Sequence, residues 1–92
     1  MVGTITKQLA KMERVREALM RFCREKLGDP SPIIELMPID VLDFFEAVVI
    51  SPKFQDMAYS ERLEAVSEFL RSAPELEEGD LNRVSRILTE EG

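Results

Sequence analysis

The chain contains no histidine and no tryptophan, and its only cysteine is Cys23. Histidine is the usual general acid or base in enzymes, and zinc sites need clusters of cysteine and histidine, so both kinds of site lack their usual residues. A single cysteine excludes an internal disulfide, which fits a reducing compartment and predicts a cytoplasmic protein. Cys23 stands among apolar residues, which is typical of core packing and not of a redox centre.

Glycine is scarce, and long apolar runs are absent. The chain has four glycines, which form no phosphate-binding loop. No segment approaches the roughly 18 apolar residues that a membrane helix needs, and the N-terminus lacks the pattern of a secretion signal, so we expect neither a membrane nor a secreted protein. The acidic stretch at residues 75–80 does not follow the order of an EF-hand loop. We therefore expect no enzymatic activity, no metal site and no cofactor.

The net charge of −6 is unevenly distributed. Residues 1–29 hold seven Lys and Arg against four acidic residues, a net charge of +3, whereas residues 30–92 hold five against fourteen, a net charge of −9. The second part would repel the phosphates of a nucleic acid, so any such contact would have to use the first part. Charged runs on helices are usually solvated faces, and the pattern therefore argues against nucleic-acid binding.

Length and pattern predict one domain, residues 1–92, that begins with a long helix. Over residues 4–27, apolar residues recur three or four positions apart and form one stripe. Thr4 is the expected N-cap, and Gly28 is the expected C-terminal cap. Such a helix would span about 36 Å, more than a domain of this size needs. We expect its first turns either to project and bind a second copy, giving a homodimer, or to fray.

Two strands are expected next. Residues 33–37 are a short candidate strand, and residues 43–51 are a longer, more apolar one. A helix over residues 40–50 is the rival interpretation of the second segment. The three consecutive β-branched residues at 48–50 suit a helix poorly, and they favour the strand.

The last third of the chain combines a clear helix with an ambiguous tail. Residues 60–71 have the apolar spacing of a helix, with Ser60 as the expected N-cap, and residues 72–80 read as a polar loop. The spacing in residues 81–89 favours a helix capped by Asp80, so a strand there would require tertiary contacts to override the pattern. An all-α fold is therefore the alternative to a mixed α+β fold.

From residue 43 onward, the order of these signals resembles the BolA-like family. That family has a strand ending in Val-Val-Ser or a variant, then a short turn with an aromatic residue, then a helix with an Arg-His-Arg core. The corresponding segments here are Phe45–Ser51, Pro52–Phe54 and Glu61–Val66. The resemblance implies a BolA-like α+β fold in the order αββαβα, with a small three-stranded sheet packed by helices.

The chain departs from the family pattern where the family carries its chemistry. Asp56 replaces the turn glycine, Leu63 the helix histidine and Glu64 the next arginine, while Asn82 falls at the histidine of the last strand. In the family, that last histidine and a loop Cys or His are associated with a 2Fe-2S cluster shared with a monothiol glutaredoxin. Asparagine is a poor iron ligand, because such clusters use thiolate and imidazole. The resemblance therefore implies the fold and a protein partner, but not the cluster.

Three hypotheses for the function follow, in order of preference. The first is a non-enzymatic BolA-like adaptor, linked to iron–sulfur or redox regulation, with a monothiol glutaredoxin as the first candidate partner. Its expected partner-binding residues surround the lost histidine positions: Phe54, Arg62, Asn82 and Arg83. Phe54 also has a structural alternative, as a core anchor below the turn. The second hypothesis is a nucleic-acid regulator using the basic first helix, and the third is a self-associating structural domain.

Overall fold

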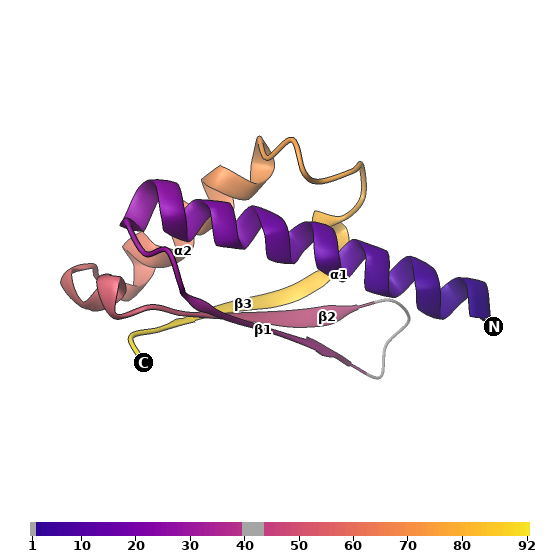
Figure 1. Cartoon of the computed structure of the whole chain (residues 1–92), viewed down its shortest axis with the longest axis horizontal. Helices are drawn as coiled ribbons and strands as arrows, with labels where there is room; N and C mark the ends of the chain where they lie inside the picture. Colours follow the sequence, from indigo (N-terminus) through magenta and orange to yellow (C-terminus); the bar gives the residue numbers. More distant parts are fainter. Residues whose placement is uncertain (1, 40–43) are drawn as a thin grey trace.

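The structure, a computed structural model, describes residues 2–39 and 44–92 as two α-helices packed on one side of a three-stranded sheet (Figure 1). Along the chain the main elements follow the order α-β-β-α-β, which confirms the α+β prediction and excludes the all-α alternative. The elements and their connecting short helices are α1 (Val2–Phe22), η1 (Cys23–Leu27), β1 (Ile33–Pro38), β2 (Phe45–Ile50), η2 (Pro52–Asp56), α2 (Tyr59–Arg71), η3 (Leu81–Arg83) and β3 (Val84–Glu90).

Helix α1 follows the predicted apolar stripe. The buried members of the stripe are Met12, Val15, Leu19, Phe22 and Cys23. The helix continues as the π-helical turn η1 and ends at Gly28, whose φ of 71° is left-handed and whose N–H donates to the Cys23 carbonyl. Glycine adopts this conformation without strain, so the predicted C-terminal cap is confirmed. The helix begins at Val2, which places Thr4 inside it, and the predicted N-cap at Thr4 is therefore wrong.

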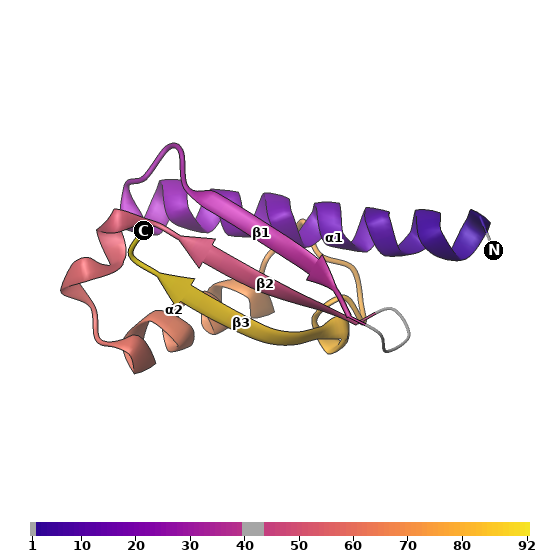
Figure 2. The same ribbon diagram turned by 90° about the horizontal axis from the view of Figure 1, so that it is seen from below.

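Strand β2 lies at the centre of the sheet, antiparallel to β1 and parallel to β3. The strand predicted over residues 43–51 is thus confirmed within its described part, and the rival helix is not formed. A parallel pair cannot be joined by a hairpin, and α2 provides the crossover from β2 to β3. Figure 2 shows the three strands side by side, with both helices behind them.

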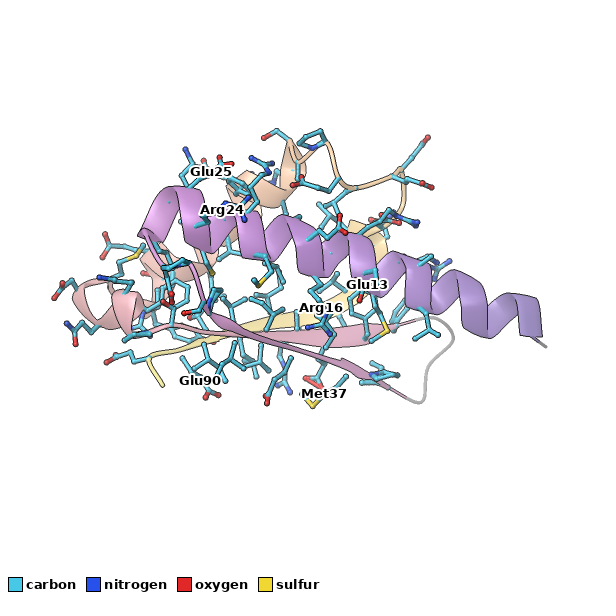
Figure 3. All side chains as sticks on the ribbon, in the orientation of Figure 1. Glu13, Arg16, Arg24, Glu25, Met37 and Glu90 are labelled. Carbon is cyan, nitrogen blue, oxygen red and sulfur yellow. The ribbon has the colours of Figure 1, made fainter. Side chains whose placement is uncertain are left out.

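The alternation of side chains along β2 gives the sheet a covered face and an open face. Phe45, Ala47 and Val49 belong to the core that α1 and α2 bury, and the residues between them point to the other side. No element of residues 2–39 and 44–92 covers that other side (Figure 2). Met37 and Glu90 project from it (Figure 3). The molecule is therefore a two-layer domain whose core cluster lies between helices and sheet, while Val48 is buried on the open face.

The tail does not form the helix that its apolar spacing predicts. After the single turn η3, residues 84–90 form β3 and pair with β2 along its length. The pairing satisfies those backbone groups of the tail that face β2, and it places the side chains of Ile87 and Thr89 on the covered face of the sheet. Tertiary contacts thus override the local pattern. Of the two possibilities left open for residues 81–89, the strand that the resemblance implies is formed, and the helix that the spacing favours is not.

Two further expectations need correction. Helix α2 begins at Tyr59, with Ala58 and not Ser60 at the N-cap position, and the Glu61 carboxylate accepts from the Ala58 N–H at 2.9 Å. The final helix of the αββαβα order is absent from the described residues, because only Glu91 and Gly92 follow β3 and neither is helical. Among the parts of the chain that the structure describes, no helix is long and apolar enough to cross a membrane.

Candidate functional site

The first two residues predicted to bind a partner lie together at the C-terminal end of β3. Phe54 is fully buried in the core, as its structural alternative predicted. The Arg62 guanidinium lies 5.5 Å from the centre of the Phe54 ring, donates to the Met57 carbonyl at 3.0 Å and binds the Glu91 carboxylate at 2.7 Å. Arg62 itself is only 7% exposed. Both side chains therefore stabilise the turn before α2, and neither is presented on the surface.

Asn82 and Arg83 lie at the opposite end of β3. Both belong to η3, where the exposed Asn82 donates its N–H to the Gly79 carbonyl and Arg83 lies over the Phe44 ring at 5.3 Å. The seven residues of β3 separate them from Arg62 by about 20 Å. The four predicted residues therefore form two separate pairs and not one surface.

The loop after α2 is tied to α1 by two arginine–carboxylate pairs that the sequence pattern did not indicate. Arg14 donates to both carboxylate oxygens of Asp80, at 2.8 and 3.0 Å, and Arg21 binds Glu75 in the same two-pronged way. Asp80 is 2% exposed. Burial disfavours its charged form, but the hydrogen bonds from Arg14 and from the Glu77 N–H outweigh burial and lower the Asp80 pKa. Two of the basic residues of α1 are thus neutralised within the domain.

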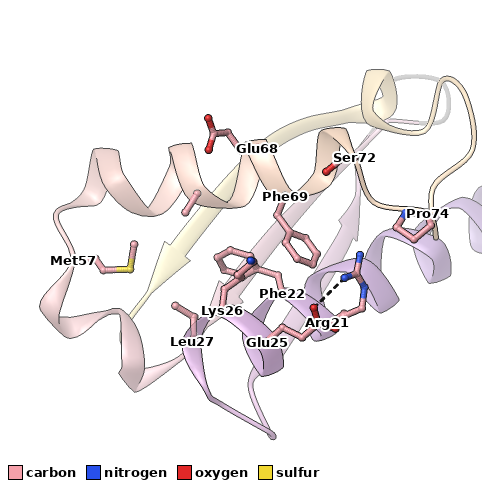
Figure 4. Close-up of a pocket in the computed structure, with 11 residues that line it drawn as sticks. Arg21, Phe22, Glu25, Lys26, Leu27, Met57, Glu68, Phe69, Ser72 and Pro74 are labelled. Carbon is pink, nitrogen blue, oxygen red and sulfur yellow. Dashed lines mark hydrogen bonds and ion pairs between the residues drawn. The ribbon is translucent and has the colours of Figure 1, made fainter.

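A groove of about 590 Å³ lies between the C-terminal end of α1 and α2 (Figure 4). Its apolar surface comes from both helices and from the turn before α2: Phe22, Leu27, Met57, Ala65 and Phe69. Phe22 and Phe69 meet edge to face, with ring centres 5.4 Å apart, and close the floor of the groove. Its volume lies within the usual range for binding sites in proteins.

Charged side chains form the rim of this groove. Arg21 stacks on the Phe69 ring at 4.4 Å and also binds Glu75 and Glu25, and the contact with Glu75 lowers the pKa of that carboxyl. Lys26 and Glu68 complete the rim, one from each side. An apolar floor between opposite charges is the arrangement of a surface that receives an apolar side chain of a partner.

The groups that could carry covalent or metal chemistry are few. Cys23 is fully buried, and burial together with the nearby Asp29 charge raises the pKa of its thiol to about 12, which keeps it protonated and unreactive at neutral pH. Asp29 accepts from the Ser51 hydroxyl and the Ser31 N–H, and these bonds lower its pKa. Within the described ranges, no group of three or more Cys, Asp or Glu side chains is placed to hold a metal ion.

Comparisons with protein-family models, curated proteins and solved structures found no match to this chain.

Proposed function

We propose that this chain is a non-enzymatic adaptor that binds a protein partner in the groove between α1 and α2. The observation that carries the proposal is the groove itself: about 590 Å³, apolar at its floor and charged at its rim. Burial of one aromatic or aliphatic side chain in such a groove contributes about 1.5–3 kcal/mol to binding. The buried, protonated state of Cys23 supports the view that the domain binds and does not catalyse.

The BolA-like resemblance and the order of elements up to β3 together support a monothiol glutaredoxin as the partner to test first. The partnership would not need a shared cluster, because Asn82 offers no imidazole or thiolate. Phe54 and Arg62 act in this proposal as supports of the turn that carries Met57, one wall of the groove. Asn82 and Arg83 stay accessible at the other end of the domain, for a contact outside the groove.

Calorimetric titration of the chain with a monothiol glutaredoxin tests this proposal. Ala65→Arg places a charged side chain in the groove and is expected to weaken binding about tenfold or more, a loss of about 1.4 kcal/mol. Ser60→Arg adds the same charge at an exposed position of α2 outside the groove, and it is expected to bind like the wild type. Equal binding by Ala65→Arg, or no binding by the wild type, would refute the groove or the partner, respectively.

The hypothesis of self-association through α1 gains support from one side chain. Leu9 lies in the N-terminal half of α1, and 57% of it is exposed. The first turns of α1 project beyond the sheet (Figure 1). A dimer that buries Leu9 would dissociate in Leu9→Lys, and light scattering over a range of concentrations measures this. A wild-type mass that stays monomeric at all concentrations would exclude it.

A further inference from the structure

We propose that the free edge of β3, together with a second groove between β3 and α2, binds an extended segment of a partner protein as an added strand. Addition of a strand to a sheet edge is a recurrent mode of peptide recognition, in which backbone hydrogen bonds give affinity and side-chain pockets give specificity. The site lies on the opposite side of α2 from the groove described above, and the inference does not depend on what fills that groove.

One hydrogen bond fixes the direction of the backbone groups of β3. The Ser51 N–H, which continues β2, donates to the Glu90 carbonyl at 2.9 Å, so Glu90 faces β2. The N–H and C=O of one residue point to the same side of a strand, and the side alternates along it. Leu88 therefore also faces β2, whereas the backbone groups of Ile87 and Thr89 face outward. No strand among the described residues pairs with this outer edge.

The second groove, of about 490 Å³, runs beside this edge. Leu63, Ser67 and Leu70 of α2 form one wall, and Val84 and Ile87 belong to the other. The helices lie on the covered face of the sheet (Figure 1). Residues of α2 line the groove, so it lies on that side. A strand added to β3 would point every second side chain to that side. These side chains would enter the groove while the backbone of the segment pairs with β3.

The charges of this groove define the chemistry of the segment. The residues that line it include two arginines, Arg71 and Arg86, and no carboxylate, although residues 30–92 carry a net charge of −9. The Arg86 side chain points to the open face of the sheet, as does its strand partner Glu46. Arg86 binds Glu46 at 2.6 Å, whereas Arg71 forms no ion pair with any described side chain. Arg71 lies at the end of α2, which approaches η3 and the start of β3. The segment should therefore carry an apolar side chain for the groove and a carboxylate for Arg71.

A second copy of the chain fits this site less well than such a segment. Each copy carries a net charge of −6, so two copies repel each other, and the groove of a second copy, which no carboxylate lines, offers no partner to Arg71. A nucleic acid also fits less well, since one unpaired arginine provides little of the counter-charge that its phosphates need.

Selection from a phage-displayed library of random linear peptides on the full chain tests the inference. We expect enrichment of peptides that alternate apolar residues and include an acidic residue. When a synthetic peptide of this kind binds, the outward amides of Ile87 and Thr89 should exchange with solvent at least about ten times more slowly. The Leu88 and Glu90 amides already face β2, and they should change much less.

Variants locate the segment. Ser67→Glu fills the groove with a negative charge and should weaken binding about tenfold or more, whereas Ser60→Glu adds the same charge outside it and should not. Arg71→Glu should shift the selected peptides from acidic to basic. Circular dichroism of each variant checks that it is folded.

Ala65→Arg separates this inference from the proposed function, because it should leave peptide binding unchanged. No enriched peptide, equal protection of all β3 amides, or undiminished binding by a folded Ser67→Glu variant would overturn the inference. So would selective, salt-sensitive binding of a single-stranded oligonucleotide at the same residues.

Discussion

The two edges of the sheet differ in whether their outward backbone N–H and C=O groups are blocked. At the β1 edge, the Ile39 N–H donates to the Phe44 carbonyl, so the backbone groups of Ile39 face β2. The direction alternates along a strand, so the backbone groups of Pro38 and Ile34 face outward. Pro38 has no N–H to offer. The Ile34 carbonyl accepts from the Arg16 guanidinium at 2.8 Å, and Arg16 reaches it from α1 (Figure 3). This edge is therefore partly blocked, at Ile34 by Arg16 and at Pro38 by the missing N–H.

The β3 edge has no such protection. No proline interrupts residues 84–90, and no described side chain donates to or accepts from the outward groups of Ile87. Natural proteins usually block exposed edges, since an open edge can pair with another chain. The proposed strand addition would use this difference between a partly blocked and an open edge, and the following variants test the difference.

The largest expected effect comes from the anchor that positions the start of β3. Asp80→Ala leaves the Arg14 guanidinium without its buried acceptor and should lower the free energy of unfolding by about 2 kcal/mol, less than for a fully buried pair because Arg14 is partly exposed. Urea denaturation measures the change. Glu78→Ala, at an exposed position of the same loop, should change stability by less than about 0.5 kcal/mol. Equal effects of the two variants would contradict the anchoring role of Asp80.

Three carboxylates, with Asp80 of this anchor among them, are expected to make the domain sensitive to acid. The folded-state pKa values of Asp80, Glu75 and Asp29 are lowered, so their contributions are complete above the unfolded values of about 4 and are lost as the pH falls through the folded values. Unfolding measured by circular dichroism should therefore show a steep loss of stability below pH of about 4. Asp80→Asn should reduce this dependence. An unchanged pH profile in that variant would assign the acid sensitivity to other groups.

A smaller effect is expected at a buried hydroxyl of β3. Thr89 is 4% exposed, and its Oγ1 has no hydrogen-bond partner among the described residues. Thr89→Val replaces this hydroxyl by a methyl group of similar size and should raise the free energy of unfolding by about 1 kcal/mol. Thermal unfolding measures it, with Ser85→Ala, an exposed position of the same strand, as the control. A loss of stability would show that the hydroxyl has a partner.

The smallest change in stability is expected at the blocked edge. Arg16→Ala removes the donor to the Ile34 carbonyl and should cost only about 0.5 kcal/mol, since water can replace the guanidinium. Its diagnostic effect is on association, because it frees the Ile34 carbonyl and leaves Pro38 as the remaining block of the β1 edge. Light scattering should then show more self-association than for Arg24→Ala, an exposed position of η1. A variant that stays as monodisperse as this control would show that Arg16 does not protect the edge.

The sequence predicts the elements whose local pattern and tertiary contacts agree. The stripe of α1, the β-branched run at residues 48–50 and the Gly28 cap all specify locally what the fold requires. Residues 81–89 could not be predicted in this way, because their spacing favours a helix while β2 offers a strand partner.

The contacts around the candidate sites could be predicted from the sequence pattern even less well. Arg14 and Asp80 are 66 positions apart, and the groove between α1 and α2 exists only after both helices pack on the sheet. The resemblance pointed to Phe54 and Arg62, which the structure places in the interior, because aromatic and arginine side chains serve packing as readily as recognition.

The parallel pairing of β2 with β3 also has a consequence during synthesis. Strand β2 is the most apolar strand, yet the partner for its second edge, β3, ends forty positions after β2, at Glu90. At about 5 to 20 residues per second, a ribosome needs about 2 to 8 s to produce the intervening chain. Until β3 is made, the second edge of β2 has no partner strand, so the complete sheet can form only after the last residues of β3 leave the ribosome.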